Sequence, residues 1–261
     1  MVKLNEIMDF LCGFAPTEYA ESYDNVGLLV GDKNKQVKRV LITLDADENV
    51  IKDAEDKECD LVISHHPLIF TPLKRIVTGN STSDTIISLI KNDICLISMH
   101  TNFDSVSSGL CDLFLGKISK TKNRTAIQGD PENGLGRIGE LCEETSLLDV
   151  LNAVKKEFKI DNLKYIGDKD KTIKKIAVCN GGGADFIYTA KDMGADVYIS
   201  GDIKYHHARF AYENGISLIE VPHYNAEIIF CEYMKDLLKK QFGNDLDILI
   251  TDKNKDVWKC I

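Results

Sequence analysis

Residues 60–70 read DLVISHHPLIF, and the organisation of the chain can be worked out from this stretch. Residues 60–64 form a short apolar run that predicts a buried β-strand. His65, His66 and Pro67 follow that strand at once. Because neighbouring side chains of an extended chain point apart, two adjacent histidines suit two metal ions better than one. An equally open interpretation is that both are polar loop residues after a strand.

The segments around this stretch alternate between strand and helix patterns. Leu4, Ile7, Met8 and Leu11 follow helical spacing and predict an amphipathic helix at the start of the chain. Further strands are predicted at residues 26–30, 39–44 and 94–98, and helices at 47–57 and 85–91. Strands that alternate with helices predict a mostly parallel sheet with helices packed on it.

A change of composition separates a second α/β region from the first. Residues 117–136 are rich in Lys, Asn, Gly and Asp and contain Pro131, which predicts a linker. Beyond it we predict a helix at residues 146–158 and strands at 173–179, 196–200, 217–221 and 247–250. The predicted fold class is therefore α/β, with two lobes.

The composition excludes several functional classes. The chain has 261 residues, with 32 Lys and Arg against 41 Asp and Glu and a formal net charge of −9. Phosphate contacts need a basic face, so nucleic-acid binding and a role as a DNA-associated regulator are not expected. The N-terminus is too polar for a signal peptide, and no apolar run approaches a membrane span. The eight cysteines include no CxxC pair, so we expect reduced thiols and a cytoplasmic protein.

The six histidines are placed unevenly along the chain. His65, His66, His100 and His223 each fall within two residues of the C-terminal end of a predicted strand. In open α/β sheets that edge is where ligands bind, so segments far apart in sequence can converge there. His206 and His207 lie within a predicted helix.

Two carboxylates accompany these histidines. Asp104 follows His100 by four residues, and the alternative interpretation is that it caps a helix beginning near residue 105 or 107. His223 and Glu227 are also four residues apart at the start of a predicted helix, which places both on one face. That spacing can present two ligands to one ion, but it is also common in surface pairs.

Together these segments predict a metal site. His65, His66, Asp104, His223 and Glu227 supply nitrogen and oxygen ligands, which favour two divalent ions such as Zn, Fe, Mn or Ni. Five protein ligands do not saturate two ions, so positions stay open for water, as hydrolytic sites require. Residues 181–183 are three glycines between a strand and a helix, and are interpreted either as an anion cradle or as a plain tight turn.

The motifs resemble those of the GTP cyclohydrolase I type 2 homologue family, also called the Ngg-interacting-factor-three-like family. The resemblance runs nearly end to end and in the correct order. It is carried by five blocks of sequence: YDNVGL at 23–28, SHHPLIF at 64–70, HTNFD at 100–104, GDIKYH at 201–206 and HYNAE at 223–227.

The resemblance implies two interlinked α/β lobes with a dinuclear metal site at the C-terminal ends of the strands between them. Lobe one, with the metal ligands, would comprise residues 1–125 and 220–261, and lobe two would be an inserted domain at 126–219. The ligands of the family fall on His65, His66, Asp104, His223 and Glu227. The resemblance also implies a toroidal homohexamer.

The function predicted from these observations is that of a metal-dependent hydrolase acting on a small molecule, which the family name suggests is a nucleotide, GTP. Asp104 is the candidate to bridge the ions. Glu227 is first a ligand and secondly a candidate base, and His100 would orient a ligand or the substrate. The alternative function is non-catalytic: storage, delivery or sensing of metal, or a regulatory scaffold ring.

Overall fold

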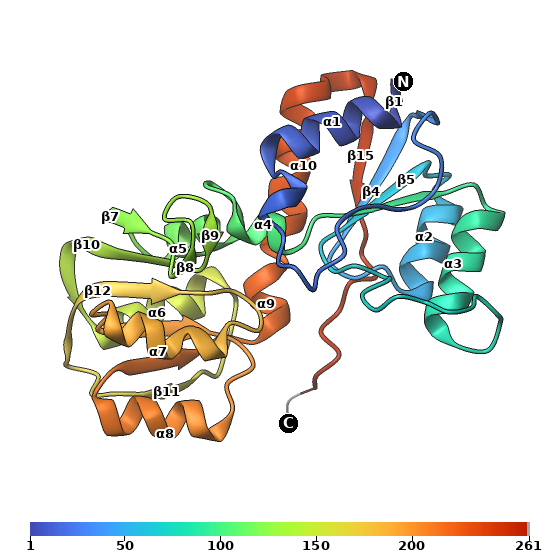
Figure 1. The fold of residues 1–261 in the computed structure, drawn as a ribbon. Coiled ribbons are helices and arrows are strands. Elements are labelled where there is room, and N and C mark those ends of the chain that lie inside the picture. The colour runs from blue at the N-terminus through green and yellow to red at the C-terminus, as the bar shows by residue number, and fades with distance from the viewer. Residues whose placement is uncertain (260–261) are drawn as a thin grey trace. The chain divides into compact units, whose positions relative to one another are not determined.

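The computed structural model describes residues 1–259, which form two compact units. Unit 1 comprises Met1–Phe103 together with the segment that begins at Phe230, and unit 2 comprises Asp104–Ile229. Each unit has its own sheet, so each is described by itself (Figure 1).

Unit 1 is built on a five-stranded sheet. The order of its strands is β15 (Asp247–Ile250), β4 (Arg39–Thr43), β5 (Leu61–Ser64), β6 (Cys95–Ser98) and β2 (Gly27–Val30). All neighbours pair in parallel except β2, which runs antiparallel to β6. Every residue of β5 and β6 is buried, as expected for parallel strands that are covered on both faces.

Helices cover the sheet of unit 1. They are α1 (Leu4–Phe14), α2 (Glu48–Asp56), α3 (Ser81–Lys91) and α10 (Ile229–Phe242), with short elements η1 (Thr17–Tyr19), η3 (Gly243–Asp245), β1 (Val2–Lys3) and β3 (Gln36–Val37). α2 and α3 pack against each other (Figure 1). The side chains of Asp47 and Asn80 cap their N-termini. Phe10 of α1 meets Phe242 of α10 edge to face, with ring centroids 5.5 Å apart.

Unit 2 is built on a six-stranded mixed sheet. The order of its strands is β11 (Lys164–Ile166), β14 (Ser217–Glu220), β13 (Val197–Ser200), β12 (Thr172–Val178), β10 (Arg137–Ser146) and β7 (Thr121–Thr125). The three central strands β14, β13 and β12 are parallel, while β11, β10 and β7 pair antiparallel. A separate short pair is formed by β8 (Gln128–Gly129) and β9 (Gly134–Leu135).

The sheet of unit 2 is covered on both faces. Alternate residues of β12 belong to two different core clusters, Ile176 and Val178 to one and Ala177 to the other. The first cluster contains α5 (Leu110–Ile118) and α6 (Leu147–Glu157), and the second contains α7 (Ile187–Asp192) and α8 (Tyr205–Asn214). The remaining helices are α4 (Thr101–Ser105), η2 (Ala184–Phe186) and α9 (His223–Glu227).

The predicted α/β class, with its alternation of strands and helices, is confirmed, whereas the prediction for one connecting segment is not. The predicted linker at residues 117–136 is wrong, because Thr121–Thr125 forms the edge strand β7. An edge strand has only one partner and few buried side chains, so its sequence is polar and lacks the apolar alternation of an inner strand. The compact units place Asp104, His223 and Glu227 in unit 2, and the lobe boundaries at 125 and 220 stay a prediction.

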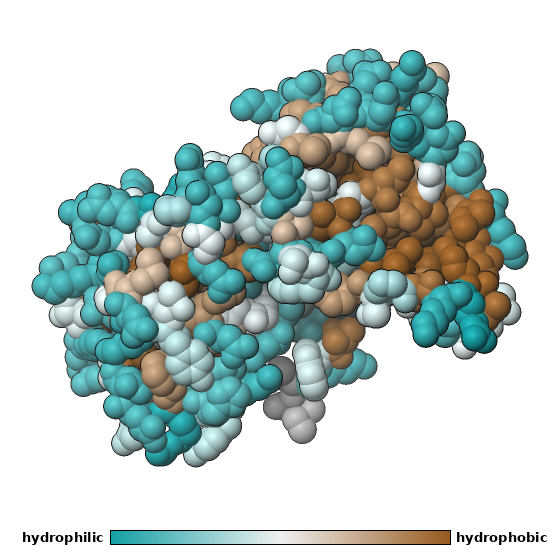
Figure 2. All heavy atoms as spheres, viewed as in Figure 1, coloured by the Kyte–Doolittle hydropathy of each residue, from teal (hydrophilic) through white to brown (hydrophobic). Residues whose placement is uncertain are grey.

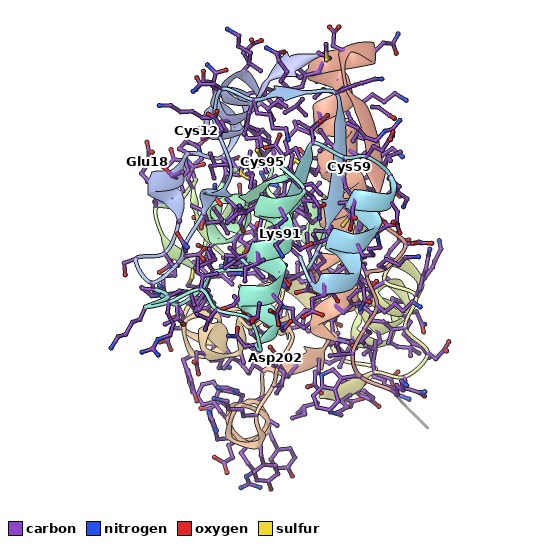
Figure 3. The ribbon with its side chains drawn as sticks, turned by 90° about the vertical axis from the view of Figure 1, so that its right-hand side faces the viewer. Cys12, Glu18, Cys59, Lys91, Cys95 and Asp202 are labelled. Carbon is purple, nitrogen blue, oxygen red and sulfur yellow. The ribbon has the colours of Figure 1, made fainter. Side chains whose placement is uncertain are left out.

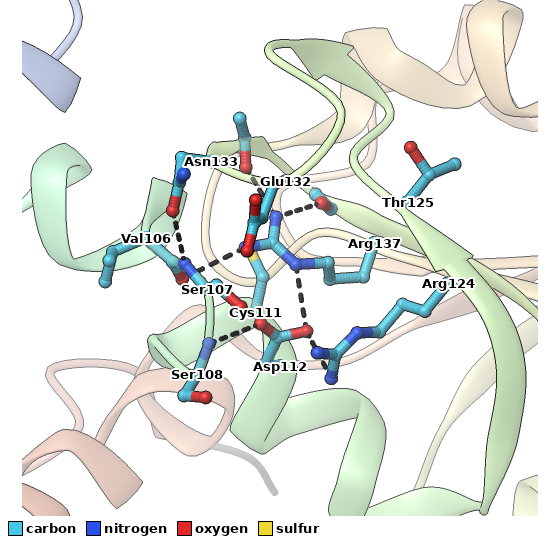
Figure 4. Close-up of polar contacts among 12 residues, drawn as sticks. Val106, Ser107, Ser108, Cys111, Asp112, Arg124, Thr125, Glu132, Asn133 and Arg137 are labelled. Atoms are coloured by element: carbon cyan, nitrogen blue, oxygen red, sulfur yellow. Dashed lines mark hydrogen bonds and ion pairs between the residues drawn. The ribbon is translucent and has the colours of Figure 1, made fainter.

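A buried arginine connects the start of unit 2 to its sheet (Figure 4). Arg137 of β10 is 1% exposed, and its Nε donates to the carboxylate of Asp112 at 2.9 Å. Its Nη2 donates to the carbonyls of Ser105 at 2.8 Å and Val106 at 3.0 Å. These two carbonyls directly follow Asp104, so the arginine anchors the segment that carries this predicted ligand.

Among residues 1–259, no helix is long and apolar enough to cross a membrane. Hydrophobic side chains appear on the face of unit 1 drawn in Figure 2, and Ile90 of α3 is 61% exposed. The described cysteines are free thiols: Cys12 and Cys142 are exposed, and Cys59, Cys95, Cys111, Cys179 and Cys231 are buried (Figure 3 labels Cys12, Cys59 and Cys95). Cys260 lies outside the described residues.

Candidate metal centre

Parallel pairing brings the ends of three strands of unit 1 to one edge of its sheet. The last residues of β4, β5 and β6 are paired in register, with Thr43 opposite Ser64 and Ser64 opposite Ser98. The residues that follow these ends therefore meet at the edge where ligands bind in open α/β sheets. They include Asp45 after β4, the pair at 65–66 after β5 and His100 after β6.

Three imidazoles gather at this edge, and we call His65, His66 and His100 the histidine half-site. Their ring centroids are 5.1 to 5.5 Å apart. One ligand atom from each lies within 4.8 Å of the other two. His65 and His66 were predicted as ligands and His100 as an orienting residue, and the structure places all three together.

Each ring of the histidine half-site is held by the same atom. In every case Nδ1 makes a 2.8 Å hydrogen bond to an oxygen atom, namely His65 to the Met99 carbonyl, His66 to Asp45 and His100 to Asp24. An oxygen acceptor requires Nδ1 to carry the proton of the neutral ring, so Nε2 has the lone pair. Histidines that bind metal are oriented in this way by carboxylates and carbonyls.

Asp24 explains the role of the YDNVGL motif. Its Oδ1 accepts from His100 at 2.8 Å, while its Oδ2 accepts from the backbone N–H of Thr101 at 3.0 Å and from the hydroxyl of Thr101 at 2.5 Å. Burial alone would raise the pKa of Asp24, but the hydrogen bonds from His100 and Thr101 outweigh it and hold that pKa well below its usual range. The carboxylate is therefore ionised and orients His100.

The other predicted ligands form a network within unit 2, and we call Asp104, His223 and Glu227 the carboxylate half-site. Asp104 is 7% exposed and Glu227 is 3% exposed. The side-chain amide of Asn180 donates to both, at 2.9 Å to Asp104 Oδ1 and 3.1 Å to Glu227 Oε1. Glu227 Oε2 lies 2.8 Å from His223 Nε2, and His223 Nδ1 lies 2.8 Å from Asp202 Oδ2.

These contacts test the simpler interpretations of both carboxylates. Asp104 lies inside α4, and the next helix, α5, is capped by Gly109, so the alternative that Asp104 is an N-cap is wrong. His223 and Glu227 do form a pair four residues apart, but Glu227 is buried, so this is not a surface pair. Buried carboxylates need partners that favour their charge, and both have them here.

The run of three glycines is a tight turn that allows Glu227 to approach the backbone. Gly181 has a φ of +58°, and a Cβ atom placed on it would lie 2.0 Å from Glu227 Oε1. Only glycine meets both demands without strain. The helix that follows, η2, has three residues. The tight-turn alternative is therefore the one that the structure supports.

His223 is the residue of this network whose charge responds to pH. Burial alone would lower its pKa, but hydrogen bonds and negative charges from Glu227 and Asp202 outweigh burial and raise the pKa to about 9. The protonated ring is thus the stable form of the metal-free protein at neutral pH. A metal ion at Nε2 would have to displace that proton.

We expect an NMR titration of the metal-free protein to give His223 a pKa of about 9. A pKa raised by folding stabilises the protein below the unfolded value of about 6.5, and this contribution is lost as pH rises towards 9. Glu227→Gln keeps the shape of the side chain but removes its charge, so it should lower the pKa of His223. An unchanged pKa in Glu227→Gln would contradict the assigned pair.

A third group of potential ligands lacks the features of the two half-sites. Asp185, His206 and His207 also bring one ligand atom each within 4.8 Å of the others. However, Nδ1 of His207 accepts from the backbone N–H of Lys204 at 3.2 Å, and its Nε2 lies 2.8 Å from Asp185. The proton is therefore on Nε2, the reverse of His65, His66 and His100. This hydrogen bond caps α8, which accounts for His207 without a metal.

Four functional residues were not selected from the sequence: Asp24, Asp45, Asp202 and Asn180. Each hydrogen bonds to a predicted site residue. Asp45, Asp202 and Asn180 follow β4, β13 and β12 by two residues. Like the histidines, each therefore lies just after the C-terminal end of a strand. That position was the available signal, since a carboxylate or amide there can orient a ligand.

Comparison with known proteins identifies relatives over the whole chain. The family model of Duf34/NIF3 (NGG1p interacting factor 3) matches residues 2–257. A Clostridium perfringens protein named GTP cyclohydrolase 1 type 2 homolog is 38% identical over 262 residues, which cover 100% of both chains. The NIF3-like protein 1 of Drosophila melanogaster is 32% identical over 97% of this chain and 88% of its own.

Solved structures agree with these relatives. A hypothetical protein of Staphylococcus aureus matches with a TM-score of 0.89 and 31% identity, covering 99% of both chains. Reduced HcgD from Methanocaldococcus jannaschii matches with a TM-score of 0.84 and 33% identity, covering 96% of this chain and 98% of that one. The predicted family is confirmed, and the chain belongs to the Duf34/NIF3 family.

Proposed function

We propose that this protein is a hydrolase that depends on two divalent metal ions, held by His65, His66, Asp104, His223 and Glu227. The observation that carries the proposal is the shared orientation of the histidines. His65, His66 and His223 each direct Nδ1 to an oxygen acceptor, as histidines that bind metal do. This leaves the lone pair on Nε2 of His65 and His66, whereas Nε2 of His223 would release its proton to bind metal. Structural histidines need no such uniform arrangement, as His207 illustrates.

The donor set fits such ions. Imidazole nitrogens and carboxylate oxygens without a cysteine suit Zn, Fe, Mn or Ni, and disfavour Cu(I) and Ca. Nδ1 of each of these histidines also contacts an oxygen atom, and metal sites use such partners to fix the orientation of the ring. When bound, two divalent ions would supply Lewis acidity and lower the pKa of water to near neutrality.

The residues of the chain have distinct roles in this proposal. Asp104 would be the candidate ligand shared by the two ions, and Asn180 orients its buried carboxylate. Glu227 is a ligand rather than a base, since Asn180 and His223 fix its two oxygens. Asp45 and Asp24 keep His66 and His100 in one tautomer, and Asp202 orients the ring of His223.

His100 is assigned to the substrate side of the centre. Its ring lies 6.4 Å from that of Phe70, which is 49% exposed. An ordered imidazole next to exposed aromatic surface can orient a substrate. Because bacterial relatives are named GTP cyclohydrolase 1 type 2 homolog, GTP is the first nucleotide to test as a substrate. We further propose a cytoplasmic, toroidal homohexamer, as the resemblance to the family implies.

Turnover by the metal-loaded protein tests the hydrolase assignment. Purified protein would be loaded in turn with Mn, Fe, Zn or Ni and offered GTP, a panel of phosphoesters and amide-like heterocycles. We expect at least one metal to support turnover that a chelator removes and added metal restores. Full occupancy by metal without turnover on any substrate would contradict the hydrolase and favour storage, delivery or sensing of metal.

A further inference from the structure

The amide of Asn180 contacts both carboxylates of the carboxylate half-site. Asn180 follows β12 and is 5% exposed. Its Nδ2 donates to Asp104 Oδ1 at 2.9 Å and to Glu227 Oε1 at 3.1 Å. An amide nitrogen has two hydrogens, so each carboxylate receives one of them. One oxygen of each carboxylate is thus held by the same rigid planar group.

The orientation of this amide is determined at both of its ends. Ionised carboxylates only accept hydrogen bonds, so the nitrogen and not the oxygen must face Asp104 and Glu227. At the other end, Asn180 Oδ1 receives the thiol of Cys111, with an S–O distance of 2.8 Å. Cys111 is fully buried on α5, so water does not compete for this oxygen.

The thiol of Cys111 is in turn held by its surroundings. Cys179, the residue before Asn180, makes a side-chain hydrogen bond with Cys111, and this bond together with burial raises the pKa of Cys179 well above its usual value. The thiol of Cys179 therefore stays protonated and can donate to the sulfur of Cys111. A chain of donors runs from Cys179 through Cys111 and Asn180 to the two carboxylates.

We infer that Asn180 is a positioning residue that preforms the carboxylate pair for metal, and that Cys111 keeps its amide in the required orientation. This inference rests on the proposed metal centre. Two buried carboxylates repel each other before a cation arrives, and the two N–H groups of Asn180 offset part of that repulsion. The ligands are then already in place, so less reorganisation accompanies metal binding.

Metal affinity of matched variants tests this role. Asn180→Leu keeps the branched shape of the side chain and removes both donors, so we expect affinity for Mn²⁺ or Zn²⁺ to fall about 10- to 100-fold. Cys111→Ser retains a donor and should change affinity little, whereas Cys111→Ala should weaken it. Cys59→Ala removes a buried thiol of unit 1 and serves as the control. Affinities are compared at a temperature where circular dichroism shows every variant folded.

Crystal structures of the metal-free variants supply a readout that does not depend on metal binding. In Asn180→Leu we expect the carboxylate of Asp104 or Glu227 to adopt a different rotamer from the wild type. If Asn180→Leu binds metal with wild-type affinity and its carboxylates do not move, the inference about Asn180 is overturned. The proposed metal centre is not affected by that result. If the wild type itself binds no metal, the proposed function fails, and unmoved carboxylates would show that Asn180 does not hold them.

Discussion

Replacing Glu227 by glutamine should weaken metal binding by more than about 100-fold. Even residues that only hydrogen bond to a metal ligand change metal affinity about 10- to 100-fold when they are replaced, and Glu227 is itself a proposed ligand. Glutamine preserves the volume of the side chain and can still accept from Asn180 Nδ2, so the fold should be retained. What it loses is the negative charge that balances a divalent ion in a buried position. Calorimetric titration with Mn²⁺ or Zn²⁺ measures the change.

Gly181→Ala is a second test of the position of the Glu227 carboxylate. The new methyl group would lie 2.0 Å from Glu227 Oε1, so the carboxylate must move away. Alanine at a φ of +58° adds strain of about 1–2 kcal/mol, which leaves the protein folded. Gly194→Ala is the matched control, because it has a φ of +81° and no atom within 4 Å of its Cβ position. Equal metal affinities in Gly181→Ala and Gly194→Ala would contradict the placement of Glu227.

Replacing Arg137 by methionine should lower the free energy of unfolding by about 3–5 kcal/mol, the usual loss when one partner of a buried ion pair is removed. Arg137 is 1% exposed and donates to Asp112 and to four backbone carbonyls, those of Gly134, Gly136, Ser105 and Val106 (Figure 4). Methionine fills a similar volume but satisfies none of these acceptors. Denaturant unfolding monitored by circular dichroism provides the measurement.

A second arginine, Arg124, shows whether burial or charge causes the expected loss of stability in Arg137→Met. Arg124 Nη1 lies 2.8 Å from the same oxygen of Asp112, but its side chain is 40% exposed. An exposed pair contributes up to about 1 kcal/mol, so Arg124→Met should cost far less than Arg137→Met. Equal losses in the two variants would show that the buried hydrogen bonds of Arg137 do not stabilise unit 2.

The strands and helices that form the cores could be predicted from sequence because their apolar patterns are long and regular. The segments 60–64, 94–98 and 196–200 correspond closely to β5, β6 and β13. By contrast, Thr121–Thr125 at the sheet edge and Arg137–Ser146 beside it were missed. β10 has buried residues only near its start and around a register shift between Glu140 and Thr145, so it lacks a regular period of two.

The candidate site was partly predictable for a related reason. His65, His66 and His100 follow parallel strands of one sheet, and pairing alone brings such residues together. Asn180 could not be selected, because its role depends on the long-range contacts with Asp104 and Glu227 rather than on any local motif. The division between the two units at Asp104 could not be read from the sequence either, because it lies inside the short helix α4.

The central claim is that five named residues bind two metal ions, and anomalous diffraction from crystals of the metal-loaded protein tests it most directly. Data collected on both sides of the absorption edge of the added metal locate each ion without reference to the proposed ligands. We predict two anomalous peaks per chain, coordinated by His65, His66, Asp104, His223 and Glu227. A single peak, no peak, or peaks at Asp185, His206 and His207 would contradict the claim.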